Sequence, residues 1–427
     1  MKTGIIGLGK MGLPIATAMD FGGHDVMGYD LNPARMSLDP QPYRETGPDG
    51  RSDFNKWLAA STVKFGSMEE VVDHADILFV MTQTPHDPEF EGLTRLPADR
   101  VDFDYQYLRE AVRQIVDVVK EPTVLVVVST VLPGTLSREL KPIIEPVKDT
   151  LALVYNPSFI AMGTTMKDFL YPEFILVGQE NVDEAETLKT FYSSFIDAPL
   201  MTMSIESAEL SKVAYNTFIG EKIIFANQVM EICDRMAGAD CDEVAGALKN
   251  AKRRLISTAY LDGGMGDGGG CHPRDNIAMS YLAQKLGLKY DLFESVMLCR
   301  EGQTDYLASM AVGYAKAMDL PVVILGQAFK PHTNLTIGSP AILLGNLIKE
   351  KGVAVQYADN DVGTALKESD VLQSPAVFVI GCKHDRYANA VFPKGSWVID
   401  PHRMIPPQAG VHIEGIGSKV RANPVKG

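Results

Sequence analysis

Short apolar runs bounded by turn residues recur along the first half of the chain, and segments with helical periodicity separate most of them. The runs lie at residues 3–6, 25–29, 76–81, 124–129, 152–155 and 174–177. Regular alternation of short strands with helices is typical of a parallel sheet that helices cover on both faces. The pattern therefore predicts a doubly wound α/β domain.

The pattern changes in the middle of the chain and then returns. Residues 204–236 form one long helical stretch that contains no proline and a single glycine, Gly220. Helical sequence continues to about residue 317, broken by the glycine-rich run 262–270, and strand-like runs resume at residues 322–325, 353–357, 377–380 and 397–399. We therefore predict two α/β domains, residues 1–203 and 318–427, joined by a long central helix and a helical connector over residues 204–317.

Composition narrows the function classes. The 427 residues carry a formal net charge of -14, which argues against a nucleic-acid partner because phosphate backbones require basic surfaces. The longest apolar stretch, residues 123–132, is too short to span a bilayer, so we expect no membrane partner. The five cysteines show no Cys-x-x-Cys spacing, which favours free thiols in a reducing, cytoplasmic compartment and no metal site.

A glycine-rich hexapeptide follows the first strand-like run and opens a helix. Its sequence is Gly7-Leu8-Gly9-Lys10-Met11-Gly12, and Asp30 ends the next run. These glycines suit a dinucleotide pyrophosphate, and an acid at the end of the second strand binds the ribose 2′-hydroxyl, which favours NAD over NADP. Arg35 weakens that preference slightly, and it could stack on adenine or pair with Asp30. The alternative is a glycine turn that binds no nucleotide.

A second glycine-rich segment, residues 263–270, leads into Cys271-His272-Pro273-Arg274-Asp275. Backbone amides can approach a ligand closely in such a loop. A cysteine at the end of the loop and near the start of a helix is typical of a nucleophile, and Asp275 would lie within its reach. The other four cysteines are expected to be small buried residues.

Three polar residues share one face of the long central helix. Glu209, Lys212 and Asn216 follow helical spacing on an otherwise apolar segment. Lys212 and Asn216 could bind a sugar hydroxyl and stabilise a developing oxyanion. The alternative is a solvated Glu–Lys pair on an exposed face.

Together these motifs resemble the UDP-glucose/GDP-mannose dehydrogenase family over nearly the whole chain. The resemblance is carried by the following segments: Gly7–Gly12 with Asp30 and Arg35, Thr84-Pro85, Ser129-Thr130-Val131-Leu132-Pro133-Gly134-Thr135, Asn156-Pro157, Ala208-Glu209-Leu210-Ser211-Lys212 with Asn216, Gly269-Gly270-Cys271 with Asp275, and Leu325-Gly326-Gln327-Ala328-Phe329-Lys330.

The resemblance implies two Rossmann-like domains, the first binding NAD and the last the nucleotide sugar, around a central helical domain that forms a homodimer. It implies two oxidations of a sugar C6 alcohol with two NAD⁺ and one water, in which Cys271 carries a thiohemiacetal and then a thioester. Lys212 would stabilise the C6 oxyanion, Asn216 would position the sugar, and Asp275 and Thr130 would organise proton transfer.

The resemblance also assigns binding residues. Cofactor contacts would come from Gly7, Gly9, Lys10, Met11, Gly12, Asp30, Arg35, Thr84, Thr130 and Arg274. Substrate contacts would come from Ser158, Phe159, Lys212, Asn216, Gly268, Gly269, Phe329, Lys330 and Arg403, with Arg254 reaching the partner subunit's substrate.

The chain departs from the family pattern at two places. Ser158 and Met162 stand where the family has acidic residues, one of them used in hydrolysis, and Ile337-Gly338-Ser339 replaces the family's Arg-Glu-Ser. Two alternatives therefore remain open. One is a two-electron dehydrogenase that stops at the aldehyde or acts on a hydroxyacid, although this class needs neither Cys271 nor a second α/β domain. The other is a catalytically impaired nucleotide-sugar binding protein.

Overall fold

The computed structural model describes residues 1–427 except 86, 181, 253–261, 267–268, 288–290 and 419–427. The chain divides into two compact units. Unit 1 comprises Met1–Pro85 and Asp102–Ala214, and unit 2 comprises His86–Val101 and Tyr215–Gly427.

Unit 1 is built on an eight-stranded sheet with the order β3-β2-β1-β4-β5-β6-β7-β8. The strands are β1 (Lys2–Ile6), β2 (Asp25–Tyr29), β3 (Lys64–Phe65), β4 (Ile77–Val80), β5 (Thr123–Val127), β6 (Leu151–Tyr155), β7 (Ile175–Gly178) and β8 (Leu200–Met203). All neighbours are parallel except β6 and β7, which form a short antiparallel pair. The central strand β4 is wholly buried, as expected for a parallel sheet covered on both faces.

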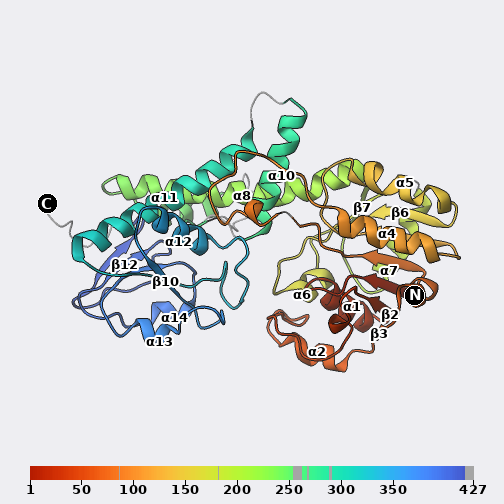
Figure 1. Ribbon diagram of the computed structural model, residues 1–427, viewed down its shortest axis with the longest axis horizontal. Helices are drawn as coiled ribbons and strands as arrows, with labels where there is room; N and C mark the ends of the chain where they lie inside the picture. The colour runs from red at the N-terminus through yellow and green to blue at the C-terminus, as the bar shows by residue number, and fades with distance from the viewer. Residues whose placement is uncertain (86, 181, 253–261, 267–268, 288–290, 419–427) are drawn as a thin grey trace. The chain divides into compact units, whose positions relative to one another are not determined.

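Helices cover both faces of this sheet (Figure 1). They are α1 (Gly12–Phe21), α2 (Phe54–Ala60), α3 (Met68–His74), α4 (Gln106–Val118), α5 (Lys141–Ile144), α6 (Thr165–Leu170) and α7 (Val182–Ser193). Local sequence fixes some of their ends: Ser67 and Glu70 form a reciprocal capping box at the start of α3. Between the helices and the sheet lies a core that includes Ile5, Leu13, Phe79 and Phe191.

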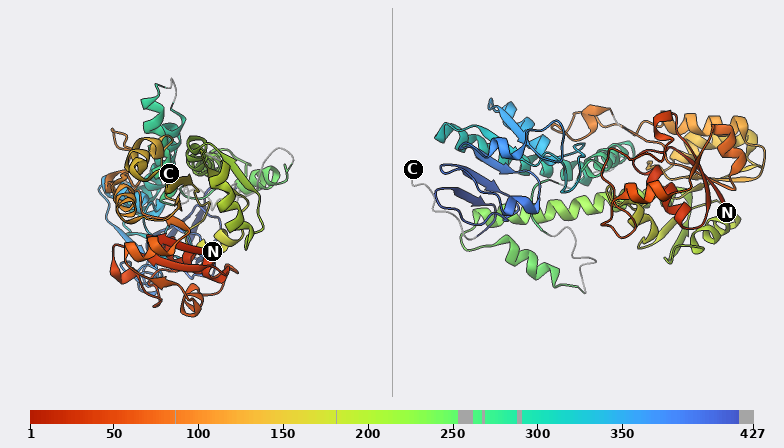
Figure 2. Two further views of the ribbon diagram at one scale, coloured as in Figure 1. Left: turned by 90° about the vertical axis from the view of Figure 1, so that its right-hand side faces the viewer. Right: turned by 90° about the horizontal axis from the view of Figure 1, so that it is seen from below.

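The long helix α8 (Ile205–Arg235) begins in unit 1 and ends in unit 2. Its 31 residues form one unbroken helix, which is yellow-green in Figure 2. The lack of proline explains this continuity, since an internal proline would remove a backbone hydrogen bond and clash with the preceding turn.

Unit 2 contains a five-stranded parallel sheet with the order β10-β9-β11-β12-β13. The strands are β9 (Val322–Leu325), β10 (Val355–Ala358), β11 (Val377–Ile380), β12 (Trp397–Asp400) and β13 (His412–Gly415). The remaining helices are α9 (Cys241–Lys249), α10 (Cys271–Lys285), α11 (Leu292–Met318), α12 (Pro340–Glu350), α13 (Glu368–Val371) and α14 (Asp385–Ala388). A core that includes Leu307, Ile324 and Leu344 joins α11 and α12 to the sheet.

The segment His86–Val101 lies between β4 and α4 in the sequence but belongs to unit 2. Arg95 forms ion pairs with Glu301, Asp305 and Glu350. The segment is therefore held to helices α11 and α12 rather than to the sheet whose strands flank it in the sequence.

The predicted fold class is confirmed: both α/β parts have Rossmann-like sheets, wholly parallel in unit 2 and parallel except for β6 and β7 in unit 1, and a long helix lies between them in the sequence. Every predicted strand is present within two residues of its expected ends, whereas β3, β8 and β13 were not predicted. The boundaries of the three predicted domains stay a prediction. Within the described residues, no helix has both the length and the apolar content needed to cross a membrane.

Candidate active site

The glycine hexapeptide of unit 1 has the geometry that a dinucleotide requires. Gly7 has a φ of +100°, which only glycine adopts readily. A Cβ on Gly12 would lie 1.8 Å from the Gly7 oxygen, so this position must be bare for α1 to approach β1. A Cβ on Gly9 would meet only Arg35, at 3.9 Å, so Gly9 leaves open space beside the backbone. This arrangement fits a closely bound pyrophosphate.

The groups around this loop suit an anion. Helix α1 has no acidic residue in its first turn, and no side chain caps its N-terminus at Met11. Partial burial, together with the nearby Arg35 guanidinium, lowers the pKa of Lys10. The free amides of a helix N-terminus and two cationic side chains form a favourable site for phosphate.

Asp30 follows β2 directly and is 6% exposed. Its carboxylate accepts hydrogen bonds of 2.8 Å from the amides of Leu8 and Asn32. Arg35 pairs with it at 3.5 Å through a side chain that is half exposed. The carboxylate is thus fixed against the glycine loop, where the ribose of a dinucleotide would lie.

Two predicted nicotinamide-side residues of unit 1 lie together. The Thr84 hydroxyl donates to the Thr130 carbonyl oxygen at 2.8 Å. Glu209 of α8 holds the loop that begins at Thr130, because it accepts hydrogen bonds from the amides of Gly134 and Leu136. Burial raises the pKa of Glu209 to about 7 and outweighs these two amide hydrogen bonds, which act in the opposite direction. Glu209 therefore acts as a loop anchor, a role that the sequence motif alone did not indicate.

Lys212 lies one turn after Glu209 and is only 7% exposed. Its ammonium group is 5.0 Å from the centre of the Phe159 ring, which in turn contacts Phe174. Two predicted substrate residues, Lys212 and Phe159, are thus in contact, and the half-buried Ser158 precedes Phe159. Because Glu209 and Lys212 are both buried, the alternative of a solvated pair on an exposed face does not fit.

Cys271 of unit 2 is the first residue of α10 and is exposed. No acidic side chain occupies the first turn of this helix, whose amides therefore favour a negative charge at its start. Three of the other cysteines, Cys233, Cys241 and Cys382, are buried as expected, and burial raises the pKa of both Cys241 and Cys382 to about 12. The expectation was wrong for Cys299, which is partly exposed on α11. Exposure and position single out Cys271 as the nucleophile candidate.

Asp275 lies one turn after Cys271 and is completely buried. Its carboxylate accepts hydrogen bonds from the side-chain amide of Asn216 and, at 3.1 Å, from Arg274. Unit 2 therefore brings together three predicted site residues, Asn216, Arg274 and Asp275. These two hydrogen bonds hold the Asp275 carboxylate in place one turn after Cys271.

The cysteine loop packs against the segment that follows β9. A Cβ on Gly269, whose φ is +111°, would lie 2.5 Å from the Phe329 ring, and Lys330 lies over the same ring. A Cβ on Gly338 would lie 2.2 Å from the Cα of Gly270. The departure at residues 337–339 thus has a structural reason, since glycine at position 338 lets the two backbones touch.

Arg300 supports this region and was not predicted. It is fully buried on α11 and donates to the carbonyl oxygens of Gly92 and Gly338. Gly92 in turn approaches Pro273, two residues after the nucleophile candidate. Arg300 therefore positions both segments that contact the cysteine loop.

The remaining predicted substrate residues lie elsewhere or outside the described residues. The Arg403 guanidinium pairs with Asp242 and donates to the carbonyl oxygens of Gly263, Pro401 and Ile416. It thus holds the start of the glycine-rich run against residues that precede and follow β13, and its predicted contact with a diphosphate stays a prediction. Arg254 and Gly268 are outside the described residues.

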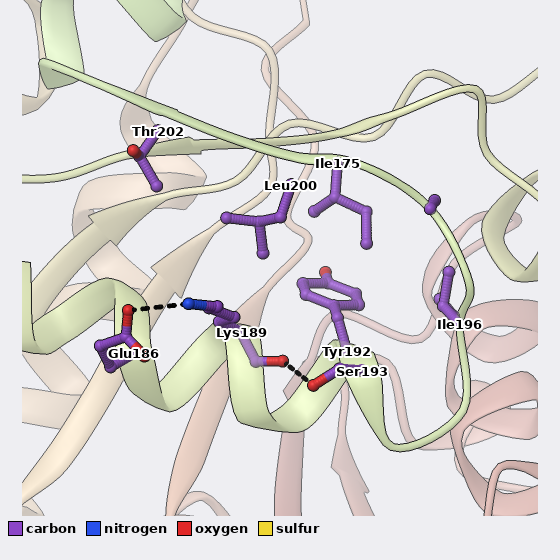
Figure 3. Close-up of a pocket in the computed structure, with 9 residues that line it drawn as sticks. Ile175, Glu186, Lys189, Tyr192, Ser193, Ile196, Leu200 and Thr202 are labelled. Atoms are coloured by element: carbon purple, nitrogen blue, oxygen red, sulfur yellow. Dashed lines mark hydrogen bonds and ion pairs between the residues drawn. The ribbon is translucent and has the colours of Figure 1, made fainter.

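A cavity of about 370 Å³ in unit 1 lies apart from this chemistry. Its lining comes from β7, α7 and β8 and includes Ile175, Tyr192 and Leu200 (Figure 3). The Lys189 ammonium at its wall pairs with Glu186. None of the predicted site residues lines this cavity.

Comparison with protein families identifies the chain. Residues 1–196 match the NAD binding domain of the UDP-glucose/GDP-mannose dehydrogenase family, and residues 206–300 match its central domain. The chain belongs to this family. It is therefore an NAD-dependent oxidoreductase of the class that acts on CH–OH groups, and the predicted cofactor NAD is confirmed.

Individual relatives are distant but match over most of their length. A GDP-mannose 6-dehydrogenase of Azotobacter vinelandii is 26% identical over 97% of this chain and 100% of its own. A UDP-glucose 6-dehydrogenase of Bacillus subtilis is 28% identical over 84% of this chain and 79% of its own. The solved structure of a UDP-glucose dehydrogenase from Pyrobaculum islandicum has a TM-score of 0.81 at 26% identity and covers 98% of both chains.

Proposed function

We propose that this protein oxidises the C6 alcohol of a nucleotide-linked hexose to the uronate through a covalent adduct on Cys271. The observation that carries the proposal is the exposed Cys271 at the start of α10, one turn before the buried Asp275. The names of the relatives support an NDP-hexose as substrate, since they include GDP-mannose and UDP-glucose 6-dehydrogenases. Their distance leaves the choice of nucleotide and sugar to experiment.

The cofactor would accept one hydride in each of two oxidations. Gly7, Gly9 and Gly12 would hold its pyrophosphate, with Lys10 and Met11 beside it, and Asp30 and Arg35 would contact the adenosine ribose. Thr84 and Thr130 would line the nicotinamide side, and Arg274 would add a further contact.

Cys271 would carry the carbon that is oxidised twice. After the alcohol has lost a hydride and a proton, the Cys271 sulfur adds to the aldehyde carbon and the oxygen takes up a proton, giving a thiohemiacetal. Loss of a second hydride and a proton gives a thioester. Water then adds to the acyl carbon, the C–S bond breaks, and the carboxylate and the free thiol result.

Other side chains would support these steps. Lys212 would stabilise the negative charge on the C6 oxygen, Asn216 would position the sugar, and Asp275 with Thr130 would accept and pass on protons. Substrate contacts would also come from Ser158, Phe159, Gly268, Gly269, Phe329, Lys330 and Arg403. The protein would act as a homodimer in the cytoplasm, in which Arg254 of each subunit would contact the substrate of the other.

Hydrolysis of the thioester would be the slow step. Ser158 replaces the usual acid, and both oxygens of Glu209 already accept backbone amides. The base would therefore be Asp275, or a water held by Ser158 and Thr130. A weakly activated water attacks a thioester slowly.

Rapid mixing of enzyme and NAD⁺ with UDP-, GDP- and dTDP-hexoses tests this proposal. We expect a burst of NADH approaching two per active site, a slower steady rate, and a sugar acyl group on Cys271 in the mass spectrum of the quenched enzyme. Cys271→Ser should abolish the acyl adduct, whereas Cys299→Ser, at the other cysteine that is not buried, should retain it. Ser158→Glu should raise the steady rate. One NADH per sugar with release of free aldehyde would support the two-electron alternative instead.

A further inference from the structure

Three side chains that can bind a metal gather at the carboxyl end of the sheet in unit 2. Asp359 among them accepts the amides of Gln327 and Ala328, which precede the proposed substrate residue Phe329. Asp359 follows β10 directly, and Asp361 lies two residues later in the same loop. His384 lies between β11 and α14. One potential ligand atom from each lies within 4.8 Å of the others. All three side chains are almost fully buried, with exposed fractions of 0%, 6% and 1%.

One guanidinium gathers the carboxylates of this cluster. Arg386 pairs with Asp359 at 3.1 Å, with Asp361 at 2.8 Å and with Glu368 at 2.8 Å. The Arg386 guanidinium is thus shared by three carboxylates, which it holds together beside His384. Buried charges are stable in proteins only when they are paired or coordinate a metal.

His384 provides independent evidence for a ligand. Neither of its ring nitrogens has a hydrogen-bond partner among the described residues. A buried polar group without a partner costs about 1–3 kcal/mol, so native proteins rarely retain one without a reason. The Nε2 atom lies 3.9 Å from Oδ2 of Asp361, too far for a hydrogen bond.

We propose that Asp359, Asp361 and His384 bind one divalent metal ion of the Mn²⁺ or Zn²⁺ type, with water completing its coordination. Two oxygens and one nitrogen are a donor set that suits such ions. Ligand atoms about 2.1 Å from a common ion lie about 3 to 4 Å from each other. The Nε2 of His384 and the Oδ2 of Asp361 already lie 3.9 Å apart, and the whole set, within 4.8 Å, would contract on binding. The ion would bind to the two carboxylates and provide a partner for the imidazole.

Such an ion would join two loops that are distant in sequence. Asp359 and Asp361 belong to the loop between β10 and α13, and His384 belongs to the loop between β11 and α14. These loops follow the carboxyl ends of β10 and β11, the two strands that flank β9. Open α/β sheets bind ligands at this edge. The ion would therefore fix the shape of this edge.

The test uses the full-length protein after chelation and dialysis. Titration with Mn²⁺, followed by the loss of the free-ion electron paramagnetic resonance signal, should show one saturable site per chain, and Zn²⁺ should compete for it. His384→Gln should weaken binding by at least about tenfold. His412→Gln is the matched control, because His412 also faces a carboxylate, Glu414, at 3.2 Å but already bonds to it.

Circular dichroism establishes that each variant is folded. Should His384→Gln not fold, Asp361→Asn decides the question, and it should also weaken binding by at least about tenfold. Absence of a saturable Mn²⁺ or Zn²⁺ site in the unmodified protein overturns the proposal. So does equal affinity in the His384 and His412 variants. These readouts do not depend on the sugar chemistry at Cys271.

Discussion

The two sheets of this protein share one backbone feature, a glycine turn whose amides bind an aspartate at the end of the neighbouring strand. The charged groups around that aspartate differ between the two sheets. In unit 1, Gly7 follows β1 with a φ of +100° and donates to Tyr29 at 2.8 Å. In unit 2, Gly326 follows β9 with a φ of +92° and donates to Ala358 at 2.8 Å. In each case the residue after the neighbouring strand is an aspartate that accepts amides from the glycine turn.

The surroundings of the two aspartates differ sharply. Asp30 has one cationic partner, the half-exposed Arg35. Asp359 shares Arg386 with two other carboxylates and lies beside His384. The comparison shows that the glycine turn and the strand-end aspartate determine where a ligand can bind but not which kind of ligand binds. The charges around that place decide between a neutral ribose hydroxyl and a cation.

The connection after the turn differs as well. In unit 1 the helix begins at Gly12, so its free amides lie close to the turn. In unit 2 the helix α12 begins only at Pro340, and the intervening residues include Phe329 and Gly338, which pack against the cysteine loop. Unit 1 thus presents a helix N-terminus to an anion, whereas unit 2 uses the same place to support Cys271.

The largest effect should follow from adding one methyl group in the turn of unit 1. Gly12→Ala would place a Cβ 1.8 Å from the Gly7 oxygen, and the backbone must move to relieve this overlap. We expect a loss of about 3 kcal/mol or more in stability, together with loss of NAD⁺ binding. Thermal unfolding and quenching of protein fluorescence by NAD⁺ measure the two effects.

Two matched variants sharpen this prediction. Gly9→Ala meets no close atom and should leave thermal unfolding unchanged, yet it should weaken NAD⁺ binding by about tenfold or more because the ligand needs that space. Gly326→Ala should destabilise unit 2, since its Cβ would lie 2.5 Å from that of Cys382, but the folded protein should bind NAD⁺ normally. Normal NAD⁺ binding by Gly9→Ala would contradict our assignment of the turn.

A second effect concerns a carboxylate that, like Asp359, accepts backbone amides but that forms no ion pair with a described lysine or arginine. This residue is Glu209, whose pKa burial raises to about 7. Its ordinary value lies near 4.5, so the folded protein binds more protons than the unfolded chain between about pH 4.5 and pH 7. Its contribution to the unfolding free energy therefore falls as the pH rises, by up to about 3 kcal/mol.

Denaturant unfolding across this pH range tests the effect. Glu209→Gln mimics the neutral acid, so the unfolding free energy of the unmodified protein minus that of the variant should decrease from pH 4.5 to pH 7 and then level off. A constant difference would show that Glu209 is ionised throughout and that the two amides outweigh its burial.

The sequence predicts the strands that carry apolar runs, among them the edge strand β10, which is only partly buried. The three strands that were missed, β3, β8 and β13, all lie at sheet edges. Half of an edge strand's environment is solvent, so β8 and β13 mix polar with apolar residues, and β3 has only two residues. Their pairing is decided by neighbours that are distant in sequence.

The same division applies to the site. Local motifs predict the glycine turn with Asp30, and they place Asp275 one turn after Cys271. They cannot predict Arg300, whose partner Gly92 lies 208 residues away. Nor can they predict the cluster at Asp359, because its histidine comes from another loop. Contacts of this kind depend on the packing of whole elements and leave no local pattern.

The smallest effect separates the two strand-end aspartates directly. Asp30→Asn keeps an oxygen for the Leu8 amide but removes the charge that repels a 2′-phosphate and weakens the bond to a ribose hydroxyl. We expect the preference for NAD⁺ over NADP⁺ to fall by about tenfold, equivalent to about 1.4 kcal/mol. Asp359→Asn makes the same exchange in unit 2 and should leave this preference unchanged while it weakens Mn²⁺ binding. The ratio of kcat/KM for the two cofactors measures the first effect. An unaltered preference in Asp30→Asn, or an equal change in Asp359→Asn, would contradict the assignment of the dinucleotide ribose to Asp30 and of the cation to Asp359.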